Sequence, residues 1–160
     1  MNTAIRTLLQ HLEVGNRLFD ASVDGLSYEE LHRRGSIHSN SMLWIAGHVA
    51  LYRHRMLALV GVTQEFPWTA LFDRGSQPAK PEDYPSIDQV RQTWREAFAL
   101  LEKRLPQLSE EEWEQPAPRS FPVPDPSLRA AVCFLGFHEA YHLGQMAYLR
   151  RSLGYPGIVG

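Results

Sequence analysis

The sequence has one cysteine, Cys133, and no long run of apolar residues. A single cysteine excludes an internal disulfide and any metal site built from a cysteine cluster. No stretch approaches the ~18 consecutive apolar residues that a membrane-spanning helix needs. The opening MNTAIRTLLQHLEVGNRL carries a polar residue every three or four positions, unlike a signal peptide. These absences predict a cytoplasmic protein without a membrane partner.

An excess of charge of one sign is also missing. The 16 Lys and Arg residues and 18 Asp and Glu residues are mixed along the chain and leave a net charge of -2. Surfaces that bind nucleic acid are basic, so we expect no nucleic-acid partner. Strict alternation of apolar and polar residues, the pattern of a half-buried strand, is absent as well. A length of 160 residues with 44% hydrophobic residues is typical of one globular domain, predicted to cover residues 1–160.

Four segments have the periodicity of amphipathic helices, with apolar residues three or four positions apart. These helices are predicted over residues 3–23, 41–60, 87–105 and 128–153. Serine, which caps helix N-termini well, stands at or directly before the start of the last three. Gly154 and Pro156 then end the last helix, which would be about 39 Å long. The sequence therefore predicts an all-α protein, a four-helix bundle.

The connections between these helices differ in length. Residues 61–86 contain several prolines and are too long for a tight turn, which predicts a long crossover between helices 2 and 3. The proline-rich residues 116–126 (PAPRSFPVPDP) are expected to be stiff and extended across the end of the bundle. Short helical turns are predicted at 27–33 and 109–113, because both begin with the serine and glutamate spacing of a capping box.

Two histidines, His138 and His142, lie four residues apart in the last predicted helix. On a helix they project from one face about one turn apart, which is the spacing that two imidazoles need to bind one ion. The side chains that point within roughly 40° of them are Ala131, Leu135, Leu149 and Leu153. Both histidines are therefore expected near the middle of the buried stripe, with Gln145 in the same direction. One such histidine would suggest a hydrogen-bonded core residue, whereas two on adjacent turns are harder to explain in that way and leave a metal site and a pair of core histidines both open.

A third ligand has to come from elsewhere, because no His, Asp, Glu or Cys follows this pair. On the second helix, His48 points about 60° from the apolar direction and can reach the interior, whereas His54 points the opposite way and is expected in solvent. His11 on the first helix lies at a similar angle, so the helical geometry leaves both His48 and His11 open. His32 and His38 fall in a connection and are expected to be solvated.

The segment HEAYH also matches the H-E-x-x-H pattern of zinc metallopeptidases, in which the glutamate is the general base. We discount this interpretation because such enzymes usually take their third ligand downstream, where this chain offers none. Glu139 points about 100° from His138, at the edge of the predicted stripe. From there it could hydrogen-bond a metal-bound water or a ligand histidine.

Several other residues have a simpler expected place. Cys133 points away from His138 and is predicted to be a small buried hydrophobe. Arg53 and Arg55 could meet an anionic substrate but are expected at the surface. Gly144 is expected to admit a neighbouring helix or subunit, because glycine within a helix costs about 1 kcal/mol relative to alanine. The tryptophans predicted to lie in the core are Trp44, Trp68, Trp94 and Trp113.

The segments SMLWIAGHVALYRHRML and FHEAYHLGQMAYLRRSLG, together with FPWTALFDRGSQP and PEDYPS between them, resemble the DinB-like (DinB/YfiT) superfamily. The likeness runs from about residue 35 to 154, and GHxAxxR and HExxHxGQ are its specific motifs. It implies a four-helix bundle with a long crossover after the second helix, often as a homodimer. It also implies one divalent metal ion, commonly nickel or zinc, bound by His48, His138 and His142, which selects His48 over His11.

The resemblance also implies a class of reaction. Some relatives are transferases or isomerases that use low-molecular-weight thiols such as mycothiol, bacillithiol or glutathione, and others are assigned as metal-dependent hydrolases. Three histidine ligands leave coordination positions open for water or substrate. We therefore expect a metal-dependent S-transferase or hydrolase for a small molecule, with its catalytic residues unassigned. The alternative is a non-catalytic stress-response protein that binds a metal or small ligand.

Overall fold

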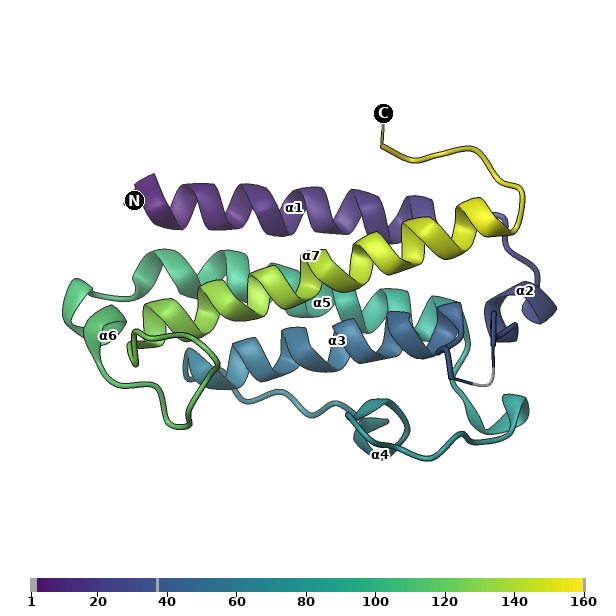
Figure 1. Ribbon diagram of the computed structural model, residues 1–160. Helices are drawn as coiled ribbons and strands as arrows, with labels where there is room; N and C mark the ends of the chain where they lie inside the picture. Colours follow the sequence, from purple (N-terminus) through teal and green to yellow (C-terminus); the bar gives the residue numbers. More distant parts are fainter. Residues whose placement is uncertain (1–2, 37, 160) are drawn as a thin grey trace.

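The computed structural model describes residues 3–36 and 38–159, and its long elements are all helices (Figure 1). The four long helices are α1 (Thr3–Val23), α3 (Met42–Leu59), α5 (Ile87–Arg104) and α7 (Leu128–Ser152). The short helical elements are α2 (Tyr28–His32), α4 (Thr69–Phe72), η1 (Pro81–Asp83), η2 (Leu105–Gln107) and α6 (Glu110–Glu114). No strand and no helix apolar and long enough to cross a membrane occurs in the described ranges. The predicted all-α four-helix bundle is confirmed.

The helix boundaries follow the capping serines. The side chains of Ser41, Ser86 and Ser127 each accept a hydrogen bond, 3.2 or 3.3 Å long, from the backbone N–H three residues later. These bonds satisfy N–H groups that the first turn of a helix leaves without a partner. The capping boxes that begin at Ser27 and Ser109 are both present and start α2 and α6. The two predicted short turns are therefore confirmed.

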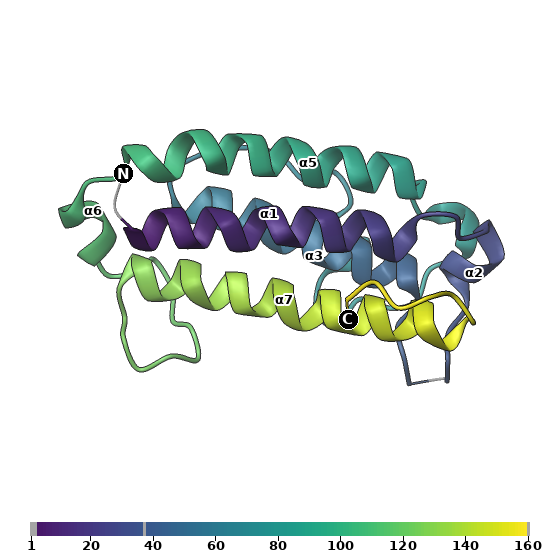
Figure 2. The same ribbon diagram turned by 90° about the horizontal axis from the view of Figure 1, so that it is seen from above.

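The four long helices form a bundle in which α1 and α3 each pack against both α5 and α7 (Figures 1 and 2). Along the chain, α1 and α7 run in one direction and α3 and α5 in the other (Figure 1). The connection between α3 and α5 contains α4 and returns along the length of the bundle, so α5 begins at the same end as α3 (Figure 1). This return is the predicted long crossover.

The crossover also buries the outer side of α3, whose buried residues run almost without a break from Met42 to Leu57. His54, which was expected in solvent, is 4% exposed. Its Nδ1 donates a 2.9 Å hydrogen bond to the carbonyl oxygen of Ala50, and its ring lies 5.1 Å from that of Phe66 in the crossover. The prediction for His54 is wrong because a connecting segment covers the face that the helical pattern left open.

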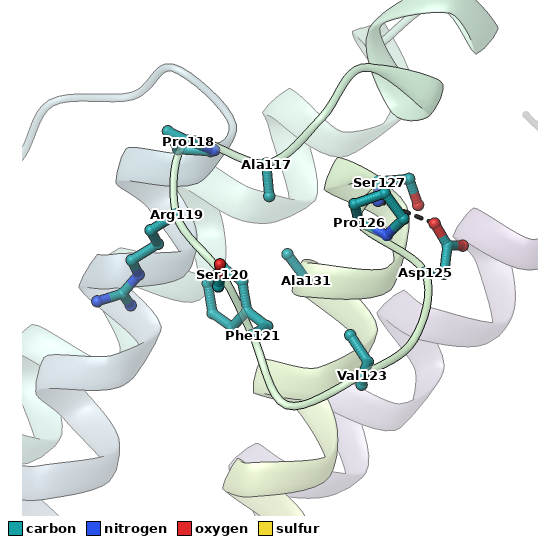
Figure 3. A pocket seen from close by; sticks show the side chains of 10 residues that line it. All are labelled: Ala117, Pro118, Arg119, Ser120, Phe121, Val123, Asp125, Pro126, Ser127 and Ala131. Atoms are coloured by element: carbon teal, nitrogen blue, oxygen red, sulfur yellow. Dashed lines mark hydrogen bonds between the residues drawn. The ribbon is translucent and has the colours of Figure 1, made fainter.

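Residues 116–126 do not cross the bundle end in an extended form. The backbone N–H of Ala117 donates to the carbonyl of Pro126 at 2.8 Å, and that of Leu128 donates to Gln115 at 2.7 Å. These bonds close the segment into a loop, and Asp125 holds its end through a 2.9 Å bond from the Ser127 N–H (Figure 3). The loop and the first turns of α7 enclose a hollow of about 370 Å³. The prediction of an extended segment is therefore wrong.

Candidate metal centre

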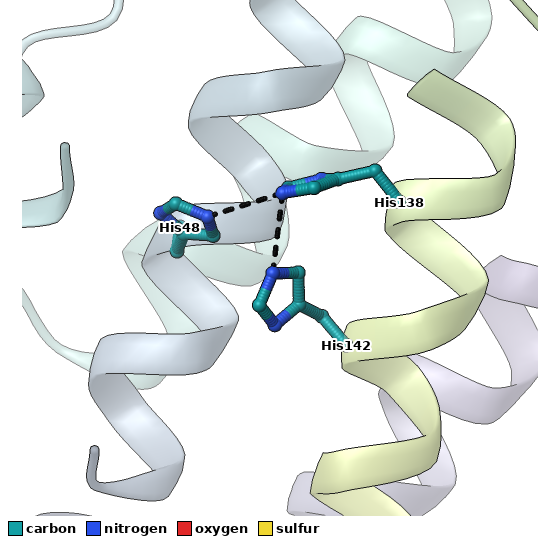
Figure 4. Close-up of side chains that lie close together, drawn as sticks. All are labelled: His48, His138 and His142. Atoms are coloured by element: carbon teal, nitrogen blue, oxygen red, sulfur yellow. Dashed lines mark hydrogen bonds between the residues drawn. The ribbon is translucent and has the colours of Figure 1, made fainter. Parts of the chain in front are cut away.

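Three histidines meet between α3 and α7 (Figure 4). The Nε2 atom of His138 lies 3.4 Å from Nε2 of His48 and 3.2 Å from Nε2 of His142. One ligand atom from each of the three lies within 4.8 Å of the others. Across residues 3–36 and 38–159, no other set of three or more His, Cys, Asp or Glu side chains has this arrangement.

The separation of these nitrogens fits a divalent ion. Metal–nitrogen bonds of about 2.0–2.1 Å in tetrahedral geometry place two ligand nitrogens roughly 3.4 Å apart. The observed distances of 3.2 and 3.4 Å are close to that value. Three imidazole ligands would also leave one tetrahedral position for water or substrate. The group formed by His48, His138 and His142 could therefore hold a metal ion.

The crossover orients His48. Its Nδ1 donates a 2.7 Å hydrogen bond to the carbonyl oxygen of Phe72, so its Nε2 carries the lone pair that faces α7. Gly47 is required for this contact, because a Cβ atom there would overlap the Phe72 ring. The next residue, Asp73, accepts two hydrogen bonds from the Arg55 guanidinium, at 2.7 and 3.0 Å. The chain around Phe72 is thus fixed to α3 on both sides of the histidine.

The histidines of α7 are oriented by different means. The Nδ1 atom of His142 donates to Oε1 of Gln145 at 2.8 Å, so Gln145 does lie on the same side of the helix as predicted. Nδ1 of His138 has no hydrogen-bond partner among the described residues. Its ring instead stacks on Tyr52, with the ring centroids 4.2 Å apart. Both Nε2 atoms are therefore directed toward His48.

Aromatic rings also pack against His48 and His142. The Trp44 indole stacks on His48 at 4.7 Å, and its Nε1 donates to the carbonyl of Leu71 in the crossover. The rings of Tyr141 and His142 meet edge to face, with their centroids 5.2 Å apart. These contacts restrict the rotation of the imidazoles and reduce their access to water, which strengthens the interactions of any charge placed between them.

Burial also keeps the imidazoles neutral. The pKa of His48 is lowered from 6.5 to about 4 and that of His138 to about 3, mainly by burial, and the nearby His142 and Arg55 contribute to both shifts. The pKa of His142 is also lowered, because burial outweighs its hydrogen bond to Gln145. Only the neutral form of imidazole binds a metal, so at neutral pH the three side chains are ready as ligands.

The two α7 histidines lie at the border of the buried face of that helix, and Glu139 lies at its centre. His138 and His142 are half-buried, whereas Glu139 is 5% exposed. The sequence predicted the opposite, with the histidines at the middle of the buried stripe and Glu139 at its edge. The fully buried positions also include Leu143 and Met146, whose direction is close to that of Glu139.

Glu139 therefore points away from the histidines. Its carboxylate accepts hydrogen bonds from Arg53 at 2.6 and 3.1 Å. The expected role of Glu139 beside a metal-bound water is wrong, and the metallopeptidase interpretation loses its general base. Arg53, expected at the surface, is 1% exposed, and that prediction is wrong as well.

The remaining histidines stand apart from this group. His11, the competitor for the third position, is exposed and lines a groove between α1 and α7 with a volume of about 630 Å³. His32 is half-buried between the rings of Tyr28 and Tyr84, and His38 is exposed. Helical direction alone could not separate His11 from His48, because both are turned by a similar angle from their apolar stripes.

Cys133 lines the same α1–α7 groove and is exposed, so the prediction of a buried thiol is wrong. Trp94 and Trp113 are buried as expected, whereas Trp44 and Trp68 are half-buried. The Phe72 carbonyl could not be predicted from the sequence, because a backbone acceptor has no signal there. The one sign of this contact in the sequence is Gly47, the small residue directly before His48.

The chain is similar to a conserved protein from Enterococcus faecalis, with a TM-score of 0.73 and 17% identity over 94% of this chain and 96% of that one. It is also similar to a DinB-like protein from Bacillus cereus, with a TM-score of 0.68 and 18% identity over 94% and 95%. A comparison with curated proteins found no match to the chain.

A third solved structure is YfiT from Bacillus subtilis, with a TM-score of 0.61 and 15% identity over 98% of this chain and 91% of that one. That protein is described as "a probable metal-dependent hydrolase with an unusual four-helix bundle topology". At these identities the likeness shows a shared fold. A family model of the DinB superfamily matches residues 11–146, and the chain belongs to the DinB superfamily.

Proposed function

We propose that the protein is a metal-dependent enzyme in which His48, His138 and His142 bind one divalent ion, nickel or zinc. The observation that carries this proposal is the convergence of three Nε2 atoms, two of them 3.2 and 3.4 Å from the third. The description of YfiT as "a probable metal-dependent hydrolase" supports it. The orienting hydrogen bonds from His48 to Phe72 and from His142 to Gln145 are those expected around metal-ligating histidines.

We propose that the substrate is a small molecule, and that the reaction is a transfer involving a low-molecular-weight thiol of the mycothiol, bacillithiol or glutathione type, or a hydrolysis. A bound divalent ion would lower the pKa of a coordinated thiol or water and so supply a nucleophile at neutral pH. The chain keeps three imidazoles neutral and oriented for that ion. Trp44 and Tyr52 shield the imidazoles from water.

Elemental analysis of protein purified without a polyhistidine tag tests the proposal most directly. We expect one equivalent of metal in the wild type and its loss, together with any activity, in His48→Ala. His11→Ala is the matched control, because His11 is exposed and lies in the α1–α7 groove. Wild-type protein that binds neither Ni²⁺ nor Zn²⁺, or a His48→Ala variant with a full equivalent, would contradict the assignment.

A second candidate is a non-catalytic stress-response protein that binds a metal or small ligand. The observation that favours it is that the carboxylates of Glu139 and Asp73 are each paired with an arginine and are not free to act as a general base. A panel of thiols with electrophiles, and of esters and amides, separates the candidates. Turnover by the metal-loaded protein supports the enzyme, whereas metal binding without turnover across the panel supports the second candidate.

We also propose that the protein forms a homodimer through the exposed side of α7. Phe137, Tyr141 and Tyr148 are 66%, 57% and 73% exposed. They recur at helical spacing and form one apolar stripe, and a Cβ at Gly144 within it would meet no atom within 4 Å. Such a stripe can pair with its own copy about a two-fold axis. Light scattering of the wild type and of Phe137→Glu tests this, with a dimer and a monomer as the expected results.

A further inference from the structure

A buried ion pair joins the two helices that carry the histidines. The Arg53 Nε and Nη2 atoms of α3 donate to the Glu139 carboxylate of α7 at 3.1 and 2.6 Å. Two parallel hydrogen bonds of this kind fix direction as well as distance. The GHxAxxR motif thus provides His48 and Arg53, and the HExxH motif provides His138 and Glu139. Each motif contributes to both the histidine group and the ion pair.

The ion pair also contacts the other two long helices. A third guanidinium nitrogen, Nη1 of Arg53, donates to Asn16 of α1 at 2.6 Å, and the plane of the guanidinium lies over Trp94 of α5, 3.2 Å from the ring centroid. A Cβ atom at Gly15 would overlap the Glu139 carboxylate, so glycine leaves the space that the carboxylate occupies. All four helices therefore meet at one polar layer.

This polar layer separates two apolar clusters. Each long helix contributes to both clusters, and on α1 Asn16 lies between Leu12 of one and Phe19 of the other. On α7, Glu139 lies between Leu135 and Leu143 in the same way. Apolar side chains tolerate small shifts between helices, whereas two charges in such surroundings can meet in one place only. A buried polar contact of this kind is best attested as a device that fixes helix register.

We infer that Arg53 and Glu139 are positioning residues for the metal site, which fix the rotation and register of α7 against α3 so that His138 and His142 face His48. The inference rests on the proposed metal-binding function. Glu139 is adjacent to His138 in the chain, and a shift of one residue along a helix corresponds to about 1.5 Å and 100°. Ligand nitrogens need to lie about 2 Å from an ion, so a shift of that size would remove a ligand from reach.

The double variant Arg53→Met/Glu139→Leu tests the inference, because it replaces both charges with apolar side chains of similar size. Replacement of a buried pair in this way often leaves stability unchanged or raises it. We expect the metal-free variant to unfold at a urea concentration no lower than the wild type. Its Zn²⁺ affinity should be weaker by about tenfold or more, and the visible spectrum of bound Co²⁺ should change. Wild-type affinity and an unchanged Co²⁺ spectrum would overturn the inference.

Two further variants make the result specific. Asn16→Leu is the control, because it removes a hydrogen bond to the same guanidinium but leaves the α3–α7 link, so its Zn²⁺ affinity should equal that of the wild type. Glu139→Gln keeps the shape of the carboxylate but removes its charge, and should weaken Zn²⁺ binding by less than the double variant does. If the double variant does not fold, Glu139→Gln alone decides. A Zn²⁺ affinity and a Co²⁺ spectrum equal to those of the wild type would then overturn the inference. A wild type that binds no Zn²⁺ or Co²⁺ contradicts the proposed function instead.

Discussion

The imidazole of His48 donates a 2.7 Å hydrogen bond to the backbone carbonyl of Phe72, 24 residues further along the chain. This bond joins the α3 histidine to the crossover rather than to another helix of the bundle. The orientation of the α3 histidine therefore depends on how the connecting segment packs.

Gly47→Ala should weaken metal binding without changing a ligand. The added methyl group would overlap the Phe72 ring. We expect α4 to move in response, which takes the Phe72 carbonyl away from His48. Overpacking of this kind costs roughly 1–3 kcal/mol of unfolding free energy. Chelator competition for Zn²⁺ and urea unfolding measure the two effects. Gly144→Ala is the control, because a Cβ there meets no atom within 4 Å, and it should keep wild-type Zn²⁺ affinity. Equal Zn²⁺ affinity in the two variants would contradict the role given to Phe72.

Glu139→Ala should strongly destabilise the protein, because it leaves the Arg53 guanidinium buried without its partner. Loss of one member of a buried pair costs about 3–5 kcal/mol. Arg129→Ala is the comparison, because Arg129 pairs with Glu110 and Glu114 at an exposed site, where ion pairs contribute about 0–1 kcal/mol. Urea unfolding of both variants measures the difference. Similar losses of unfolding free energy in the two variants would show that the Arg53–Glu139 pair contributes no more to stability than an exposed ion pair.

The metal-free protein should lose stability as the pH falls below about 6.5. Burial lowers the pKa of His48 to about 4 and that of His138 to about 3 in the folded state, from 6.5. Between these values the unfolded chain takes up protons that the folded protein excludes, so the unfolding free energy decreases with decreasing pH. His54, whose pKa burial also lowers, contributes in the same window.

Urea unfolding of wild type and His138→Gln between pH 4.5 and 7 isolates one of these contributions, because glutamine does not titrate. The variant should show the smaller dependence on pH. An identical pH dependence in both proteins would mean that His138 is not excluded from protonation in the folded state.

Metal removal should lower the melting temperature. A ligand that binds only the folded state at 1,000 times its Kd stabilises by about 4 kcal/mol, so Zn²⁺ should raise the melting temperature of metal-free wild type and a chelator should reverse the change. His142→Ala should lose the response, whereas His11→Ala should keep it. Calorimetric scans at several Zn²⁺ concentrations measure this, and a response in His142→Ala equal to that of wild type would remove His142 from the site.

The parts predicted correctly from the sequence depend on short-range interactions. Serine caps and capping boxes placed the helix starts within one or two residues, because each involves a hydrogen bond across three positions. The spacing of His138 and His142 likewise follows from one turn of helix. The length of the segment between α3 and α5 was enough to predict a crossover, since no short turn can contain it.

Apart from the shape of residues 116–126, the predictions that failed concern which side of a helix meets which neighbour. His54 is buried because the crossover covers α3. Glu139 is buried because α1 and α3 pack against a side of α7 that the apolar residues of α7 did not define uniquely. A helix with apolar residues on most sides has no single inward direction in its sequence. Residue direction alone also left the choice between His48 and His11 undetermined, because both side chains are turned by a similar angle from their apolar stripes.

The sequence by itself determined the helices, the order in which they follow one another and the pair of histidines one turn apart, because these depend on contacts within a few residues. The tertiary structure decided that His48 completes the group, that Phe72 orients it and that Arg53 and Glu139 lie in the core. Those relationships join segments 24 to 90 residues apart, and they depend on how the helices and the crossover pack together.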